Sequence, residues 1–403
     1  MMFLQEAKAQ VLKHSTSLKK PKTNPDSSKY ESQHYYRADW QKIDVDFLNS
    51  YYSQDGNNGA VTGGIGTERL TDFTQKLSIS FPTSPQLRWN IDAAYDYYSS
   101  ASTDNIDNIR SSDSSSDIRS QLNIGIQYQH NQKVTTGLRL GTSIEYDYTS
   151  FHAGANFSIL SSNGNRRFDA MVQSFYDTWI PFYPTELRGM VSIPTDKRQT
   201  YNAAVSLSQV LNSKLQVSIM GEATYMNGLL STPFHRVYFN DQPIPDIERL
   251  PDNRLKIPLG LRMNAYLSER LILRSYYRYY WDSWDMSAHT INVELPIKIN
   301  RFFTIYPHYR YHTQSAAEFF APYAIHSSDS NFYTSDYDLS SLNSHTYGIG
   351  VMYSPNSGIA RLGIPFSKGS SISMEAIDIK ASVFNRNTGL NAWIVSIGFK
   401  FGI

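Results

Sequence analysis

Apolar and polar residues alternate along most of the chain from Ile43 onward, in segments of about 10 to 14 residues. In segment 87–97 the odd positions read Leu, Trp, Ile, Ala, Tyr and Tyr, whereas the even positions are mostly Arg, Asn and Asp. Segments 254–263 and 393–403 alternate in the same way. A period of two residues indicates a β-strand whose faces meet different surroundings. These segments exceed the usual globular strand and match the roughly 9 to 11 tilted residues that cross a bilayer.

The connections between these segments also alternate in length. Short connections such as 82–86 and 130–133 are interleaved with mostly long ones, such as 99–116 and 315–342, which are rich in Ser, Asp and Asn. The pattern predicts an all-β fold: a single transmembrane antiparallel β-barrel of about 16 strands, with short periplasmic turns and long extracellular loops. The long connection 354–370 falls on the short-turn side and breaks the pattern. The alternative is a secreted β-sandwich or solenoid, which the strand length and the lack of a repeat period disfavour.

Composition narrows the classes of protein. The chain has 403 residues, with 37 Lys+Arg against 36 Asp+Glu and no Cys. This charge balance excludes a nucleic-acid binder driven by electrostatics, so no nucleic-acid partner is expected. The lack of Cys excludes a disulfide scaffold, a thiolate zinc site and a Cys nucleophile. No run approaches the roughly 18 to 20 apolar residues that a transmembrane helix needs.

The first residues differ from the rest. Ala7-Lys8-Ala9 before Gln10 resembles a signal-peptidase site, but the apolar segment of a signal peptide is missing. We therefore interpret 1–39 as a truncated signal remnant followed by a disordered, Lys- and Ser-rich periplasmic tail, and 40–403 as the barrel.

Several strings in the expected loops resemble domain-of-unknown-function family 3570, a family of predicted Gram-negative outer-membrane β-barrel proteins. The strings are Asp55-Gly56, 61–68 (VTGGIGTE), 176–179 (YDTW), 230–239 (LSTPFHRVYF), 248–251 (ERLP), 320–323 (FAPY) and 334–338 (TSDYD). The resemblance extends over about 40–403. It implies an outer-membrane location, with lipid and lipopolysaccharide as the surroundings, and it implies no activity.

If the apolar register faces lipid, the other register lines the lumen. Its charges sort into an acidic excess on the first seven strands and a basic excess on the ninth to thirteenth. On the acidic side we expect Lys76, Arg88 and Arg139 as the inward cations. Opposed walls of this kind create a transverse field across a pore, but the same groups could also pair and fill the barrel. The candidate lumen-lining residues are Asp92, Asp96, Glu222, Arg262, Arg274, Arg278, Glu294, Lys298, His308 and Arg310, with Glu294 expected between Arg274 and His308.

Two loop features suggest further chemistry. Segment 227–252 is too apolar to lie in water, so we expect an ordered hairpin or a constriction, with Phe234, His235 and Arg236 as its candidate residues. The other long loops are acidic, and oxygen-rich clusters suit calcium. The acidic residues are Asp104, Asp107, Asp113, Asp117, Glu318, Asp329, Asp336 and Asp338. Their spacing matches no known calcium loop, so no cofactor beyond a possible calcium ion and no metal ligand is assigned.

The sequence therefore predicts an outer-membrane barrel of a Gram-negative bacterium that acts as a channel or uptake component for a small polar solute, and not as an enzyme. One alternative is a barrel with a filled lumen whose extracellular loops bind a protein partner in surface interaction or assembly. The other is an outer-membrane lipid hydrolase, for which Ser287 and His289 form the local pair. A GxSxG motif is absent from the sequence.

Overall fold

The computed structural model describes residues 42–101, 117–363 and 371–402, so the predicted tail 1–39 lies outside the described residues. Sixteen strand positions form one closed antiparallel wall. The wall strands are β1 (Asp44–Asp55), β2 (Arg69–Pro82), β3 (Leu87–Ala101), β4 (Asp117–Gln129), β5 (Val134–Ile144), β6 (Tyr148–Leu160), β7 (Arg166–Trp179), β8 (Lys197–Asn212), β9 (Leu215–Gly228), β12 (Asn253–Tyr266), β13 (Ile272–Asp282), β14 (Ser287–Glu294) with its continuation β15 (Ile297–Lys298), β16 (Phe303–Gln314), β17 (Leu342–Tyr353), β19 (Ser371–Arg386) and β20 (Asn391–Gly402).

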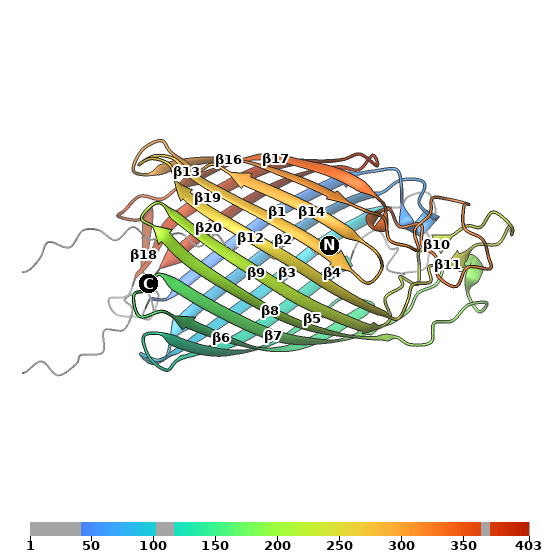
Figure 1. Cartoon of the computed structure of the whole chain (residues 1–403), viewed down its shortest axis with the longest axis horizontal. Helices are drawn as coiled ribbons and strands as arrows, with labels where there is room; N and C mark the ends of the chain where they lie inside the picture. The colour runs from blue at the N-terminus through green and yellow to red at the C-terminus, as the bar shows by residue number, and fades with distance from the viewer. Residues whose placement is uncertain (1–41, 102–116, 364–370, 403) are drawn as a thin grey trace, which may run out of the picture. The chain divides into compact units, whose positions relative to one another are not determined.

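The barrel closes because its first and last strands pair with each other (Figure 1). The β1–β20 ladder runs antiparallel from Asp44 opposite Gly402 to Asp55 opposite Asn391. Closure gives each of the sixteen wall strands a neighbour on both sides, which a spanning sheet requires because lipid offers no hydrogen bonds. The predicted fold and strand number are confirmed, and the alternating segments 87–97 and 254–263 lie within β3 and β12.

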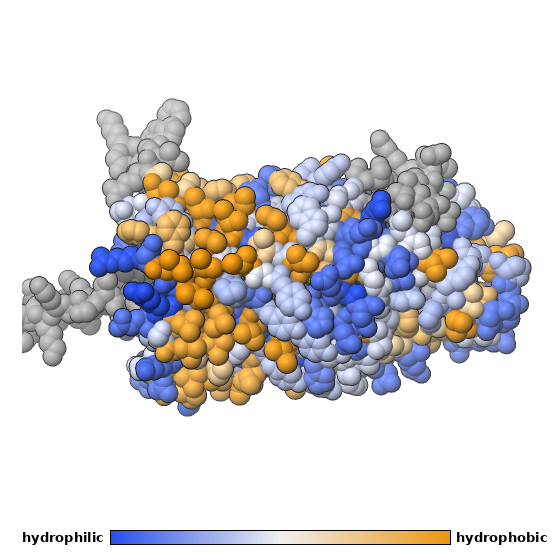
Figure 2. Space-filling model, turned by 90° about the horizontal axis from the view of Figure 1, so that it is seen from above, coloured by the Kyte–Doolittle hydropathy of each residue, from blue (hydrophilic) through white to orange (hydrophobic). Residues whose placement is uncertain are grey.

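Apolar side chains of the wall point outward. Leu138 and Leu140 are 62% and 65% exposed, and Ile219, Phe151 and Ile349 are similarly open. Figure 2 shows these residue types gathered in a hydrophobic region over part of the barrel wall. An apolar surface of this extent is stable in hydrocarbon and not in water.

The described residues include no helix that is both long and apolar enough to span a membrane. Their helical elements are the short 3-10 turns η2 (Ala60–Thr62), η4 (Thr185–Leu187) and η5 (Tyr337–Leu339).

Two details of the connections differ from the simple alternation. The long inner connection 354–370 contains a short strand, β18 (Ala360–Gly363), that pairs with the start of β19. Outer connections 145–147, 283–286 and 387–390 are short, so Glu145 and Asp147 lie in a tight outer turn instead of on a strand.

The long outer loops pack against one another at one end of the barrel (Figure 1). Segment 229–252 contains a small hairpin of β10 (Arg236–Val237) and β11 (Asp246–Ile247), as expected from its apolar composition. Val237, Phe239 and Tyr333 form one buried apolar cluster, and Leu250, Trp284, Met286 and Ala317 form another. These clusters join segment 229–252 to segment 315–341, and they give the outer mouth a core of its own.

Candidate functional site

The acidic side of the lumen is largely paired with arginines. Asp96 lies opposite Arg119 in the β3–β4 ladder, and Arg119 Nη2 lies 2.6 Å from Asp96 Oδ2. Asp92 forms an ion pair with Arg139 and accepts a hydrogen bond from Ser78 Oγ (2.6 Å). The predicted acidic wall is therefore weaker than expected.

The expected charge excess on this side omitted basic residues of the same inward register. Besides Arg119, Arg167 forms an ion pair with Asp169 (2.8 Å), and Arg198 on β8 forms one with Asp177 (2.8 Å). The physical reason is that a carboxylate with little access to water needs a cation at close range. The next strand supplies it for Asp96 and Asp177, whereas Arg167 and Asp169 pair along the same strand.

The basic side carries the predicted arrangement around Glu294. Arg274 lies opposite Glu294 in the β13–β14 ladder, with Nη1 2.7 Å from Oε1, and His308 lies opposite it on β16. His308 Nε2 lies 3.1 Å from Ser382 Oγ. Glu294 is thus held by a neighbouring cation.

The other lumen candidates differ in their partners. Glu222 accepts a hydrogen bond from Asn202 Nδ2 (2.6 Å), and the Arg262 guanidinium lies 5.6 Å from the centre of the Tyr276 ring. In the described parts of the chain, Arg262, Arg278 and Lys298 form no ion pair. Arg310 lies opposite Asn292 in the β14–β16 ladder.

Arg236 connects three outer loops. Its Nε and Nη2 donate to the two carboxylate oxygens of Glu186 (2.5 and 3.1 Å), and Nη1 donates to the Val61 carbonyl (2.8 Å). The Arg236 side chain is only 5% exposed. The Arg236 guanidinium is therefore held inside the contacts between these loops. Arginine's planar fork matches a carboxylate and leaves a third donor for the carbonyl.

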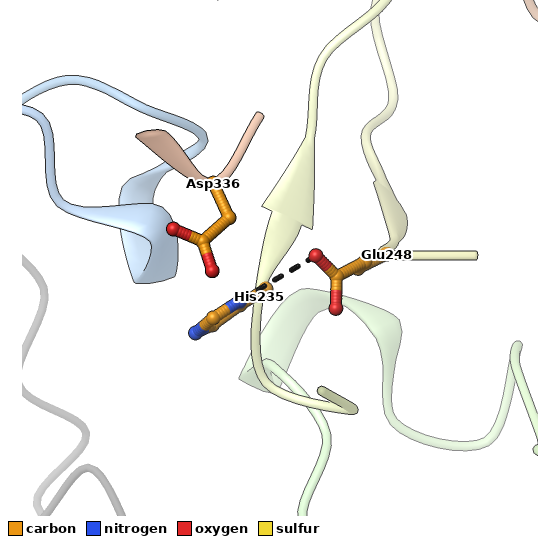
Figure 3. Close-up of side chains that lie close together, drawn as sticks. All are labelled: His235, Glu248 and Asp336. Atoms are coloured by element: carbon orange, nitrogen blue, oxygen red, sulfur yellow. Dashed lines mark ion pairs between the residues drawn. The ribbon is translucent and has the colours of Figure 1, made fainter. Parts of the chain in front are cut away.

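Beside Arg236, His235 meets two carboxylates (Figure 3). One donor atom each from His235, Glu248 and Asp336 lie within 4.8 Å of one another, and His235 Nδ1 is 3.8 Å from Glu248 Oε1. The Glu248 side chain is 3% exposed. The ring of Phe234, the remaining candidate of this loop, meets the His235 imidazole edge-on with centroids 5.1 Å apart.

Hydrogen bonds orient both carboxylates of this group. Glu248 Oε1 accepts from Thr334 Oγ1 (2.5 Å), and Oε2 accepts from the Thr232 amide (2.7 Å). Asp336 Oδ1 accepts from the Asp338 amide (2.9 Å), which makes Asp336 the N-cap of η5. In contrast, His235 Nδ1 is buried and has no hydrogen-bond partner among the described residues.

The burial of this group and its two carboxylates shift the pKa values of His235 and Asp336. Burial would lower the pKa of His235, but the adjacent Glu248 carboxylate outweighs it and raises that pKa overall. Burial, with a further contribution from the charge of Asp338, raises the pKa of Asp336 to about 6. A cation at this position would relieve both effects.

A second group of carboxylates lies at the start of β4. Asp117, Glu145 and Asp147 place oxygens within 4.8 Å of one another, and Tyr98 Oη donates to Glu145 (2.8 Å). The all-oxygen set is of the kind expected for calcium. The other acids of that loop, Asp104, Asp107 and Asp113, lie outside the described residues.

The local pair of the hydrolase alternative is not arranged for catalysis. His289 Nδ1 lies 2.8 Å from Tyr277 Oη, and Ser287 Oγ lies 3.5 Å from Ser315 Oγ. A nucleophilic serine needs a base within hydrogen-bond reach. The imidazole of His289 instead faces the tyrosine of the neighbouring strand.

Sequence reasoning reached His235 and Arg236 but missed their partners Glu186, Glu248 and Thr334. Glu248 and Thr334 do lie in strings that carry the family resemblance, as do Val61 and Asp336. Those strings, distant along the chain, meet at the outer mouth. The sequence signal for these partners is that the strings which carry the family resemblance fall in the expected loops.

The chain is similar, at low sequence identity, to several solved structures of outer-membrane proteins. A bacterial polysaccharide outer membrane secretin is 9% identical, with 89% of this chain and 97% of that chain covered and a TM-score of 0.47. OccK1 (OpdK) of Pseudomonas aeruginosa is 6% identical, with 90% and 98% covered and a TM-score of 0.41. OccAB3 of Acinetobacter baumannii is 9% identical, with 90% and 99% covered and a TM-score of 0.42. Scores of this size carry no argument about what binds or crosses.

No curated protein matches the chain. The family model described as "Protein of unknown function (DUF3570)" matches residues 83–360, a stretch that begins just before β3 and ends in β18. It includes both loops that supply His235, Glu248 and Asp336. The match spans well over half of the chain, and the protein therefore belongs to the DUF3570 family.

Proposed function

We propose that the protein is an outer-membrane channel or uptake component for small polar solutes. The observation that carries this proposal is the closed wall of sixteen strands with ionised groups on its inward register. Barrels of about 16 strands enclose more space than their inward side chains fill, whereas barrels of about eight strands can be filled. Partial exposure of inward groups such as Arg262 and Arg274 fits a water-filled interior.

The distribution of pairing favours solutes that carry negative charge. Most acids of β1–β7 are neutralised by arginines, whereas Arg262, Arg278 and Lys298 form no ion pair within the described residues. The net field inside the lumen then points from the β12–β16 side toward the opposite wall. Such a field attracts anions and orients dipolar solutes.

The packed outer mouth supports selective uptake over free diffusion. Segments 229–252 and 315–341 share two buried apolar clusters and the Glu248–Thr334 hydrogen bond, so the mouth is ordered. A solute entering from outside must pass between these loops or displace them. Passage is then restricted by loop contacts as well as by the charge of the lumen.

Single-channel recording in planar bilayers tests the proposal. We expect steady current with a preference for anions, which Arg278→Glu reduces because it reverses an unpaired inward charge. Lys133→Glu is the matched control, since it makes the same charge change at an exposed turn on the inner rim. Absence of steady current in the wild type, or equal selectivity of the Arg278 variant and the wild type, would contradict the proposal.

A second candidate function, binding of a protein partner by the outer loops, has one observation in its favour. Apolar side chains of these loops are open to water, among them Met190, Ile244 and Ile325. Apolar groups outside the bilayer mark contact surfaces when they gather. The same recording separates the two functions, because a filled barrel that serves only as a partner gives no steady current.

A further inference from the structure

We propose that His235, Glu248 and Asp336 bind a divalent transition-metal ion of the Zn²⁺ class, which fastens segment 229–252 to segment 315–341. His235 and Glu248 come from the first segment, on either side of the β10–β11 hairpin, and Asp336 comes from the second, immediately before η5. Figure 3 shows the two carboxylates approaching the imidazole from different sides. The proposal does not depend on the channel function.

The hairpin register explains why two of the ligands meet. Arg236 is opposite Ile247, so the next position places His235 opposite Glu248, and the Glu248 amide donates to the His235 carbonyl (2.9 Å). Thr334 connects the third ligand, Asp336, to Glu248. Its hydroxyl donates to Glu248 Oε1 (2.5 Å) and accepts from the Asp336 amide (3.0 Å).

The donor set selects the class of ion. Imidazole nitrogen and carboxylate oxygen are both ligands of zinc, and a site with three protein ligands leaves the fourth position to water or another ligand. Calcium and magnesium prefer oxygen ligands alone, so the imidazole distinguishes this site from the calcium site expected for the acidic loops. With no Cys in the chain, sulfur ligation cannot compete.

The distances are close to those that coordination requires. Ligand atoms about 2.0–2.1 Å from a tetrahedral zinc ion are roughly 3.4 Å apart. His235 Nδ1 and Glu248 Oε1 are 3.8 Å apart, and the whole set lies within 4.8 Å. Ligand atoms that are at most 4.8 Å apart must approach one another by up to roughly 1.4 Å to reach this spacing, which side-chain rotations supply.

Hydrogen bonds from neighbouring groups orient the two carboxylates, as hydrogen bonds to the ligands do in metal sites. Glu248 accepts hydrogen bonds on both oxygens, and Asp336 accepts one from the Asp338 amide. His235 Nδ1, by contrast, is buried without a hydrogen-bond partner in the part of the chain that the structure describes. A buried ring nitrogen beside two carboxylates has two solutions: a metal ion between them, or a proton on the imidazole.

Equilibrium binding of Zn²⁺ separates these solutions. The full chain, purified in detergent without a polyhistidine tag, is titrated with Zn²⁺ in competition with a chromophoric chelator. We expect one ion per chain, with affinity reduced at least about tenfold in His235→Gln and in Asp336→Asn, since even second-shell losses reach that size. His130→Gln, at an exposed inner turn, is the matched control and should bind as the wild type does.

X-ray absorption of the Zn²⁺-loaded wild type tests the site without any substitution. A shell of one imidazole and oxygen ligands at about 2.0–2.1 Å is expected. A shell without imidazole, a shell with several imidazoles, or equal affinity of the His235 variant and the wild type would overturn the proposal and leave a protonated imidazole. Neither measurement requires ion conduction, so failure of the metal site and failure of the channel are distinguishable.

Discussion

Replacing Arg236 with Met should loosen the packed outer mouth while leaving the barrel wall intact. Arg236 connects segments 56–68, 180–196 and 229–252 through Glu186 and the Val61 carbonyl. Methionine keeps much of the aliphatic stem but cannot donate a hydrogen bond. The change therefore separates the charged contacts from the packing of the side chain.

The magnitude follows from the exposure of the two partners. Breaking a fully buried ion pair by removing one member costs about 3–5 kcal/mol. Here Arg236 is 5% exposed but Glu186 is 42% exposed, so the remaining carboxylate recovers its hydration. The lost bond to the Val61 carbonyl, a hydrogen bond to a charged donor, contributes about 1.5–3 kcal/mol. We expect a loss of about 2–3 kcal/mol, which raises the population of the opened mouth roughly 30- to 150-fold.

Native-state proteolysis measures that population directly when opening is fast relative to cleavage. Cleavage within 180–196 and 229–252 should accelerate by the stated factor, while the wall strands stay protected. Arg249→Met is the matched control on the same segment, because Arg249 is 59% exposed and lies 3.9 Å from Asp246. Such a surface pair contributes about 0–1 kcal/mol. If both variants accelerate cleavage equally, or if neither does, the structural role assigned to Arg236 is wrong.

Three further predictions concern the outer rim. Burial raises the pKa of Glu68 to about 7, although the nearby Arg386 opposes this and the charge of Asp338 adds to it, so folding favours the protonated acid. The stability of the rim should therefore fall as pH rises from about 4.5 to 7. Glu68→Gln should reduce that loss by on the order of 2 kcal/mol in thermal melts at stepped pH, and an unchanged pH profile in this variant would contradict the prediction. Asp282→Ala should lower the free energy of unfolding in urea by about 3–5 kcal/mol, because it removes a fully buried acceptor and leaves Arg254 without its ion-pair partner. Asp285→Asn, at an exposed position, should change that free energy little. Gly64→Ala should open the loops to protease, because its φ of +87° is strained for alanine and the new Cβ would lie 2.7 Å from the Ser335 carbonyl oxygen. Gly164→Ala is the control for backbone strain alone, because Gly164 has a φ of +71° and open space around it. Equal effects of the two variants would show that the contact with Ser335 does not matter.

The barrel wall could be predicted because its pattern has a single physical cause. Lipid and water act on opposite faces of every strand, so a slip of one residue would turn a whole apolar face inward. This sets the register of strands such as β3 and β12 without knowledge of their neighbours. The departures occur where that constraint ends: Glu145 and Asp147 lie in a tight outer turn, and β18 forms beyond the inner end of β17.

The charges of the lumen were predicted only in part. The neighbours of Glu294 follow from turn positions in adjacent hairpins, and Arg274 and His308 lie opposite it as expected. The predicted excess of acid on the first strands is too large because it leaves out Arg119, Arg167 and Arg198. Electrostatics acts on pairs: Asp96 and Asp177, both of low exposure, are each matched by an arginine on the next strand.

The outer mouth required information of a different kind. A hairpin in segment 229–252 is predictable from its apolar composition, and its register then brings His235 to Glu248. Nothing in either loop indicates that Asp336 joins them, since that contact depends on closure of the barrel and on which loops fold across its end. Long-range placement of this kind lies outside what periodicity determines.

The wall and the mouth therefore use sequence differently. Many side chains satisfy the alternation of a strand, because lipid and water impose a class of residue and not an identity. The contacts at the mouth admit few substitutes: the Arg236 fork spans Glu186 and Val61, Thr334 links Glu248 to the Asp336 amide, and Gly64 approaches the Ser335 backbone. The strings that alternation does not explain are those that meet there. In a barrel of this kind, loop residues left unexplained by the strand pattern are where specific chemistry should be sought first.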